Sequence, residues 1–393
     1  MARTVYIVGA ARTPIGRFGG SMLGSTAVEI GGTAIRGALA NTGVPAEAVE
    51  FCVMGHARQA GNGPNPGRLM ALAGGLPVTA PTYSTQMACL SGFLAVHQAA
   101  SAILEGEAEV AVAGGSEHMS SIPHLASGVR WGTRMGDTTL TDALHKDGFM
   151  CPINQAHMGK LCDNMAREQN ISREDQDAFA LRSQQLTAQA QDDGRLARMI
   201  VPVEIPGRKG PTTLSEDETP RRDTSAEGLA RLKPAFVADG SITPGNAPGI
   251  CDGAAALVLA SEEAVRRHDL TPLARIVGHT MAALDPKDAF VAPVAAGRRL
   301  AARLEFRIQD ADHYEFNEAF AAMMLATIRQ LELDQDKVNT WGGAVALGHP
   351  IGMSGTRIIQ TLAQRLVDEG GRYGVAGICG NGGHGGAMLL ERA

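Results

Sequence analysis

The stretch "SGFLAVHQAASAILEGEAEVAVAG" at residues 91–114 aligns without gaps on "SGTRIIQTLAQRLVDEGGRYGVAG" at residues 354–377, an offset of 263 positions. Each copy predicts an SG turn, an amphipathic helix, a charged link and a buried strand. A second pair, "IVGA" at residue 7 and "IVGH" at residue 276, repeats at the similar offset of 269 positions. Two similar offsets predict that the chain contains an internal duplication.

Outside this repeat, short β-branched runs such as "VYIVGA" and "YGVAGI" alternate with alanine-rich helical stretches at residues 92–104 and 356–367. This alternation is typical of an α/β fold. From about residue 120 to 248 the pattern loosens into Gly/Pro-rich loops and polar helices, one of which Ser172 is expected to cap. We therefore expect one half from residues 1–119 and 249–270, a loop domain inserted at 120–248, and a second half at 271–393.

Composition narrows the class of protein. The chain has 393 residues, of which 44% are hydrophobic, enough to bury a sizeable core. Its net charge of −6, without a run of five like charges, argues against nucleic acid or an anionic membrane as the partner. The sequence shows no secretory signal pattern, and we expect no apolar stretch of eighteen residues that would span a bilayer.

The cysteines are far apart and contain no CxxC pair; they are Cys52, Cys89, Cys151, Cys162, Cys251 and Cys379. Neither a disulfide framework nor a structural zinc site fits this spacing. We therefore expect a reduced, cytoplasmic protein without a bound metal. For any single cysteine, a small buried apolar side chain is the alternative to a chemical role.

Two turns of the repeated halves carry reactive side chains. Cys89 precedes the predicted helix of the first half, whose dipole and free N–H groups are expected to lower its thiol pKa, so it is a candidate nucleophile. His349 occupies the matching turn of the second half, in "ALGHPIG". A lone histidine is more often a core residue, but a cysteine and a histidine at corresponding turns favour chemistry.

The segment "GICGNGGHGG" at residues 377–386 surrounds Cys379 with glycines. A phosphate-binding loop would open a helix, whereas "AMLLERA" follows here and predicts a strand. Cys379 and His384 are too few ligands for a metal. We interpret the glycines as a bare backbone that approaches a thioester or its oxyanion closely.

Asn317, in "FNEAFAAMMLAT", adds an amide that can hold a water or an oxyanion beside His349. Taken alone, this asparagine is equally well read as a routine helix cap. Together with the two cysteines and the histidine it completes a coherent set of four polar groups.

These segments resemble the thiolase family over essentially the whole chain. The resemblance rests on "ARTPIGRFGG", the turn after Cys89, "AGGSEHMS", "HMG", "GNAPGICDGAAA", "NEAFA", "GGAVALGHPIGMSGTRI" and the glycine loop around Cys379, in this order. It implies the thiolase fold, with duplicated five-layered α/β/α/β/α halves and an inserted loop domain, assembled as a homodimer or homotetramer.

The resemblance also implies a reaction: CoA-dependent cleavage of a 3-oxoacyl-CoA to acetyl-CoA and a shortened acyl-CoA, or the reverse Claisen condensation, in a ping-pong mechanism. Cys89, deprotonated by His349, would become acylated, and Cys379 would protonate the acetyl-CoA enolate and then deprotonate the incoming CoA. The backbone at Cys89 and at Asn381 and Gly382 would hold the oxyanion. Coenzyme A is then a substrate, no cofactor is needed, and fatty-acid β-oxidation is the expected setting.

Contacts to the acyl-CoA are expected from seven residues: His157, Met158, Arg221, Thr224, Pro248, Phe320 and Leu90. Several positions depart from the usual family pattern, namely Pro64, Gln86, Leu90, Pro248, Ala289, Phe290 and Asn381. We expect these departures to cluster on the substrate side. They therefore predict an active thiolase whose acyl group is not simply acetoacetyl.

Two other functions are open at this point. A ketoacyl synthase of the same superfamily would also acylate a cysteine, but it decarboxylates malonyl groups with a second histidine or asparagine, and Cys379 argues against it. A non-catalytic, acyl-CoA-binding thiolase-like subunit would not need the four polar groups.

Overall fold

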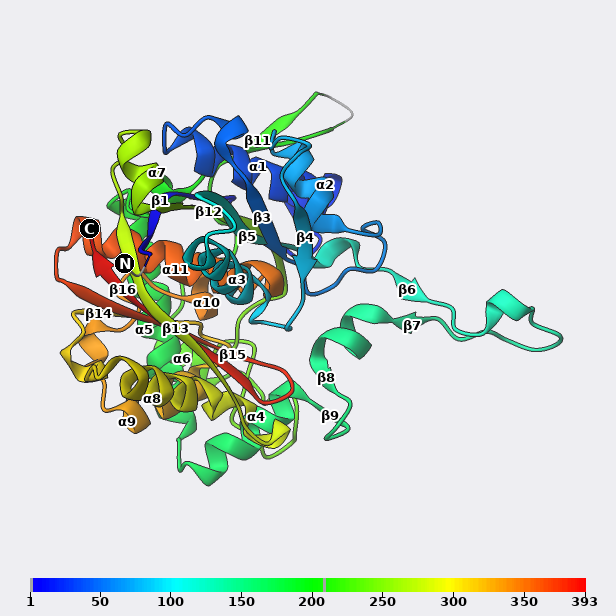
Figure 1. Cartoon of the computed structure of the whole chain (residues 1–393). Coiled ribbons are helices and arrows are strands. Elements are labelled where there is room, and N and C mark those ends of the chain that lie inside the picture. Colours follow the sequence, from blue (N-terminus) through cyan, green and yellow to red (C-terminus); the bar gives the residue numbers. More distant parts are fainter. Residues whose placement is uncertain (1–2, 208–209) are drawn as a thin grey trace.

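The computed structural model describes residues 3–207 and 210–393, and a mixed β-sheet runs through both halves of the chain (Figure 1). At its middle, β1 (Val5–Arg12) pairs antiparallel with β13 (Ala274–Ala283), with Val5 opposite Ile276. These are the strands that contain "IVGA" and "IVGH". The two copies of the predicted repeat therefore begin on neighbouring strands, one on each side of the middle of the sheet.

The strand order is the same on both sides of the β1–β13 pair. Beyond β1 lie β12 (Cys251–Ser261), β5 (Val110–His118), β3 (Phe51–Gly55) and β4 (Thr82–Thr85), and beyond β13 lie β16 (His384–Arg392), β15 (Tyr373–Gly380) and β14 (His313–Phe316). In each half the inner strands are antiparallel and the outermost pairs are parallel. The short strand β2 (Gly16–Arg17) pairs with β12. This shared order is what a duplicated unit produces.

The helices of the repeat form the middle layer. α3 (Ser91–Glu105) packs on β3 and β5, and α11 (Ile351–Asp368), which begins earlier than the predicted residue 356, packs on β5, β12, β15 and on α3. α1 (Ala27–Ala40) and α2 (Pro66–Ala73) cover the outer face of the first half, and α8 (Ala292–Leu304) with α9 (Ala321–Leu331) covers the second (Figure 1). The halves together thus form five layers, α/β/α/β/α.

Helix α3 corrects the expectation that the chain contains no stretch of eighteen residues apolar enough to span a bilayer. By length and composition alone, Ala88–Glu105 is apolar enough to cross a bilayer, and it is the one such segment among residues 3–207 and 210–393. In the structure 56% of this window is buried, between the two halves of the sheet. Its apolar character is explained by this place in the core.

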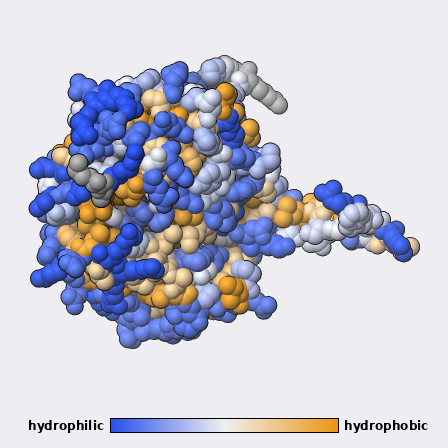
Figure 2. Space-filling view, viewed as in Figure 1, coloured by the Kyte–Doolittle hydropathy of each residue, from blue (hydrophilic) through white to orange (hydrophobic). Residues whose placement is uncertain are grey.

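Residues 120–248 carry short elements that connect β5 to β12. They comprise the hairpins β6–β7 (His124–Leu125 and Thr141–Asp142), β8–β9 (Met150–Cys151 and Ala156–His157) and β10–β11 (Val203–Ile205 and Thr212–Leu214), with α4 (Met158–Glu168), α5 (Arg173–Asp192) and α6 (Ala226–Ala230). Ser172 caps α5 by accepting a hydrogen bond from the Asp175 N–H, as predicted. The β6–β7 hairpin projects from the body as an arm (Figures 1 and 2).

The main chains of α3 and α11 touch at glycines. A Cβ atom on Gly92 would lie 2.6 Å from the Gly352 carbonyl oxygen, and one on Gly352 would lie 2.7 Å from the Ser116 carbonyl oxygen. Real side chains do not approach backbone oxygens so closely. The first turns of the two helices therefore meet at a separation that requires glycine.

We predict that Gly92→Ala lowers the free energy of unfolding by about 1–3 kcal/mol, because the new methyl group pushes α3 away from α11. Urea unfolding followed by circular dichroism measures the change. Gly249→Ala is the matched control, because its Cβ would meet nothing within 4 Å. Equal unfolding midpoints for the two variants would contradict this account of the packing.

Candidate active site

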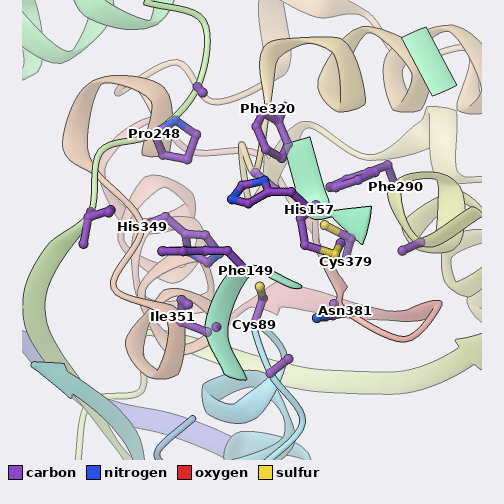
Figure 3. Close-up of a pocket in the computed structure, with 18 of the residues that line it drawn as sticks. Cys89, Phe149, His157, Pro248, Phe290, Phe320, His349, Ile351, Cys379 and Asn381 are labelled. Atoms are coloured by element: carbon purple, nitrogen blue, oxygen red, sulfur yellow. The ribbon is translucent and has the colours of Figure 1, made fainter. Parts of the chain in front are cut away.

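Three of the four predicted reactive groups, Cys89, His349 and Cys379, meet in one cavity of about 220 Å³ between the two halves, and Asn317 is buried outside its wall. Cys89, His349, Cys379 and Asn381 all line it, although they come from three separate turns of the chain. Figure 3 shows both cysteines and the His349 ring around the same space. The structure therefore brings together the nucleophile, base and acid that were predicted from the sequence.

Cys89 lies in the turn between β4 and α3. Ala88, directly before it, has a φ of 49°, a left-handed conformation that is uncommon for a residue with a Cβ. The hydroxyl of Ser91 stabilises this turn, since it accepts from the Met87 N–H at 2.9 Å and donates to the Ala88 carbonyl at 2.7 Å. The thiol is thus presented by a rigid, locally strained turn.

Burial controls the protonation of this thiol. Desolvation raises the pKa of Cys89 to about 11, although the positive charge of Arg58 and the Asn381 N–H act in the opposite direction. The expectation that the helix terminus lowers this pKa is therefore wrong, because desolvation outweighs the favourable dipoles. Cys89 is a neutral thiol at rest and needs a base.

His349 is placed to be that base, in the turn between α10 (Ala344–Leu347) and α11. Its Nδ1 lies 2.6 Å from Oγ of Ser354, whose hydroxyl donates to the Pro350 carbonyl at 2.9 Å. Because that hydroxyl has only one hydrogen, its oxygen accepts from Nδ1–H, and Nε2 keeps its lone pair. Burial, then the positive charges of Arg357 and Arg58, lower the pKa of His349 to about 3, so the ring is neutral.

Asn317 stands beside this ring. Its Nδ2 lies 3.5 Å from Nε2 of His349, and its Oδ1 is buried without a hydrogen-bond partner among the described residues. It is not a helix cap, because α9 begins only at Ala321. The neighbouring Glu318 carboxylate accepts from the Val345 N–H and the Asn339 amide, both at 2.9 Å, and so anchors the loop.

Cys379 lies near the end of β15. Desolvation, and then the negative charge that Cys89 can carry, raise its thiol pKa well above the ordinary value. The second thiol is therefore also protonated at rest and can act as an acid. The dependence of its pKa on Cys89 reflects the proximity of the two sulfur atoms.

The glycines around Cys379 have a different role from the one predicted. A Cβ on Gly380 would lie 2.5 Å from the Leu90 side chain, one on Gly386 would lie 2.7 Å from the Phe93 ring, and those on Gly377, Gly383 and Gly385 would also collide with packed protein atoms. Of the six glycines only Gly380 belongs to the cavity wall. They mainly allow close packing beneath the site, rather than clearing space for substrate.

Four of the expected acyl-CoA contacts line the cavity, namely His157, Met158, Pro248 and Phe320. The other two polar ones, Arg221 and Thr224, line an adjoining depression that shares Ala247 and Ile250 with the cavity wall. The two spaces therefore share part of their walls, and the second one carries the cationic side chains of Arg17 and Arg221.

Leu90 and Gly382 do not lie where the sequence suggested. Leu90 is fully buried and packs under Gly380, because it follows Cys89 into the first turn of α3. Gly382 lies in the turn between β15 and β16, outside the cavity wall in the described part of the chain. Gln86 and Pro64 are exposed and likewise do not line it. The departures that alter the wall are Pro248, Ala289, Phe290 and Asn381.

The sequence did not reveal several further wall residues, among them Arg58, Phe149 and Phe236. Phe149 ends a single π-helical turn, His145–Phe149, and Phe236 follows α6 in an irregular loop. Neither has a periodic pattern that would single it out. Within the described residues, no group of three or more His, Cys, Asp or Glu side chains is arranged to hold a metal ion.

Two cysteines and a histidine at the meeting point of two duplicated α/β halves define a thiol-dependent acyl-transfer site. Residues 5–263 match the thiolase N-terminal domain and residues 270–392 match the thiolase C-terminal domain. The chain belongs to the thiolase family of acyltransferases, and the predicted fold class is confirmed.

Several relatives match along the full chain. Acetyl-CoA acetyltransferase of Chromobacterium violaceum is 45% identical over 389 residues, which is 99% of both chains. The crystal structure of the Bacillus anthracis acetyl-CoA acetyltransferase superposes with a TM-score of 0.97 at 42% identity and covers 100% of this chain and 99% of that one. The crystal structure of human mitochondrial 3-ketoacyl-CoA thiolase superposes with a TM-score of 0.96 at 38% identity, and it covers 100% of this chain and 99% of that one.

The neutral state of His349 predicts a pH dependence of stability. Below its ordinary pKa of 6.5 the unfolded chain binds a proton that the folded protein, with a pKa of about 3, does not bind. The free energy of unfolding should therefore be largest above pH 6.5 and fall with pH towards 3, by up to about 1.4 kcal/mol per unit for this group.

Urea unfolding at a series of pH values measures this slope. His349→Gln should make it shallower, and the matched control His124→Gln, at an exposed position in β6, should retain the wild-type slope. An unchanged slope in His349→Gln would show that the histidine is not held neutral by the fold.

Proposed function

We propose that this protein is a thiolase, which cleaves a 3-oxoacyl-CoA with coenzyme A to acetyl-CoA and a shortened acyl-CoA and also catalyses the reverse condensation. The observation that carries the proposal is that two thiols and an imidazole line one cavity, where burial raises the pKa of both thiols and lowers that of the imidazole. The relatives named acetyl-CoA acetyltransferase and 3-ketoacyl-CoA thiolase support it.

In the first half-reaction, Nε2 of His349 takes the proton of the Cys89 thiol as the sulfur attacks the C3 ketone. The main-chain N–H groups of Cys89 and Asn381 face the oxyanion that forms. The bond between C2 and C3 then breaks, and its electron pair becomes the enolate of acetyl-CoA, next to His349 and Asn317. Cys379 gives its proton to C2, so acetyl-CoA leaves and acyl-Cys89 remains.

In the second half-reaction, the Cys379 thiolate takes the proton of the incoming CoA thiol. The CoA sulfur attacks the acyl carbon, the bond to Cys89 breaks, and the departing thiolate recovers its proton from His349. Every group returns to its starting state, and no metal or redox cofactor is needed. The two alternative functions are less well supported. A ketoacyl synthase would not require Cys379, and a non-catalytic acyl-CoA-binding subunit would not require any of the four polar groups.

Coenzyme A itself is proposed to enter through the depression around Arg221 and Thr224. Arg221 and Arg17 supply positive charge there for the phosphates, and the shared residues Ala247 and Ile250 lead to the inner cavity. The thioester arm then passes between His157 and Pro248, which both line the inner space.

The acyl end of the cavity is aromatic, and four of the chain's ten phenylalanines line it. Adjacent ring centroids lie 5.8 Å apart for Phe149 and His157, 4.6 Å for His157 and Phe236, 6.3 Å for Phe236 and Phe320, and 5.3 Å for Phe320 and Phe290. A cavity of about 150 Å³ suffices for a benzene molecule. We therefore propose that the preferred acyl group ends in an aromatic ring.

A homodimer or homotetramer in a reduced cytoplasm remains part of the proposal. Trp131 and Met135, on the arm between β6 and β7, are 88% and 96% exposed, and apolar side chains so prominent favour a second copy of the chain as their partner. All six cysteines are free. Sedimentation velocity would give the assembly mass.

The chemistry is tested by intact-protein mass after incubation with acetoacetyl-CoA. The wild type should gain one acetyl group, Cys89→Ser should gain none, and Cys379→Ser should lose about 10²–10⁴-fold in turnover because it lacks the acid. Cys52→Ser, outside the cavity, is the control and should behave as wild type. Acetylation of Cys89→Ser would contradict the proposed nucleophile.

The acyl preference is tested by kcat/KM for a phenyl-ended 3-oxoacyl-CoA, its cyclohexyl analogue and acetoacetyl-CoA. Edge-to-face ring contacts predict a preference for phenyl over cyclohexyl of about 3–10-fold. Phe290→Leu should reduce this ratio, and Phe306→Leu, in an aromatic pair with Tyr373 outside the cavity wall, should not. Best activity on acetoacetyl-CoA would refute the aromatic preference and leave the thiolase proposal intact.

A further inference from the structure

Arg58 is a buried cation in the cavity wall that the mechanism above does not use. Its side chain is only 6% exposed, and it lies just beyond the end of β3. One terminal nitrogen donates to the Ala57 carbonyl and the other to the Gly148 carbonyl, both at 3.0 Å, while Nε has no hydrogen-bond partner in the described part of the chain. These two contacts fix the plane of the guanidinium.

No carboxylate neutralises this charge within salt-bridge distance among residues 3–207 and 210–393. Two other buried arginines differ, since Arg12 pairs with Asp217 at 2.6 Å and Arg365 pairs with Glu315 at 2.8 Å. Removing an unpaired charge from water costs several kcal/mol unless a negative charge compensates it. Arg357, which is 1% exposed, is likewise without a carboxylate partner among the described residues, but Arg58 alone of these faces the cavity, where an anion would compensate its charge.

The nearest acid along the chain fold, Glu117 on β5, is occupied by the main chain. Its carboxylate accepts from the N–H groups of Ala57 and Arg58 at 3.0 Å and from that of Gly352 at 2.9 Å. Glu117 thus holds the backbone of residue 58 against the first turn of α11. It positions Arg58 without pairing with its guanidinium.

Arg58 and Glu117 are the charged side chains that act on Cys89, Cys89 in turn acts on Cys379, and Arg357 and Arg58 act on His349. Of these, Arg58 is the one cation among the described wall residues. The sulfur of Cys89 becomes negative when it is deprotonated and again when it leaves the acyl group. That thiolate is the anion which the proposed reaction itself generates in this cavity.

We propose that Arg58 stabilises the Cys89 thiolate electrostatically and so acts as a positioning residue for the nucleophile. The inference rests on the proposed function of Cys89. The positive charge of Arg58 also disfavours a proton on His349. Arg58 therefore helps most in the second half-reaction, when the Cys89 thiolate departs from the acyl group and His349 returns its proton. If Arg58 only supported the fold, the reactivity of Cys89 would not depend on the charge at position 58.

The test is the pH dependence of Cys89 alkylation by iodoacetamide, measured by peptide mass on the full-length protein. Arg58→Gln keeps an amide N–H donor at this position but removes the charge. We expect its alkylation profile to move to higher pH and its rate at pH 8 to fall about tenfold. Arg58→Lys keeps the charge and should remain near the wild-type profile.

Arg68→Gln is the matched control. Arg68 also donates to two carbonyls, those of Ala80 and Val78, but it does not belong to the cavity wall of the described chain. If Cys89 reacts but its pH profile is unchanged in Arg58→Gln, the proposed role of Arg58 is wrong and the proposed function stands. The same holds if Arg58→Lys shifts the profile as much as Arg58→Gln does. A wild-type Cys89 that fails to react at any pH would overturn the proposed function as well.

Discussion

The site depends on the direct contact between the main chains of α3 and α11. Gly92 meets the Gly352 carbonyl where no Cβ fits, and the Glu117 carboxylate ties Gly352 to the loop that carries Arg58. Cys89 and His349 each lie two residues before one of these helices. Their separation is therefore set by backbone packing, which side-chain motion cannot relax.

Enclosure between the two halves then determines the chemistry. The same loss of water raises the pKa of both thiols and lowers that of His349, so the resting site is neutral apart from Arg58. In the proposed mechanism, each charge that appears during acyl transfer would be met by a group already in place: Nε2 of His349, the N–H of Asn381 and the guanidinium of Arg58. Preorganised groups of this kind are worth more in a dry cavity than in water.

The departures from the usual family pattern divide according to position in the fold. Pro248, Ala289 and Phe290 belong to the cavity wall, and Phe290 extends the series of aromatic rings that begins at Phe149. Leu90 lies as close to the nucleophile in sequence as any residue, yet it fills the core beneath Gly380. Because the chain enters α3 directly after Cys89, the side chains of Cys89 and Leu90 point in different directions. Adjacency to the nucleophile in sequence therefore does not predict contact with substrate.

The sequence by itself determined the duplication, the α/β alternation, the thiolase family and the candidate reactive residues, because repeats, periodicity and motif order are properties of the chain. It did not determine the thiol pKa values, the packing role of the glycines around Cys379, or the presence of Arg58, Phe149 and Phe236 in the wall. Only the tertiary structure decided these, since desolvation and contact arise from segments far apart in the chain. The turn at Cys89 is a helix terminus that lowers a thiol pKa in water, and burial beneath the second half reverses that effect.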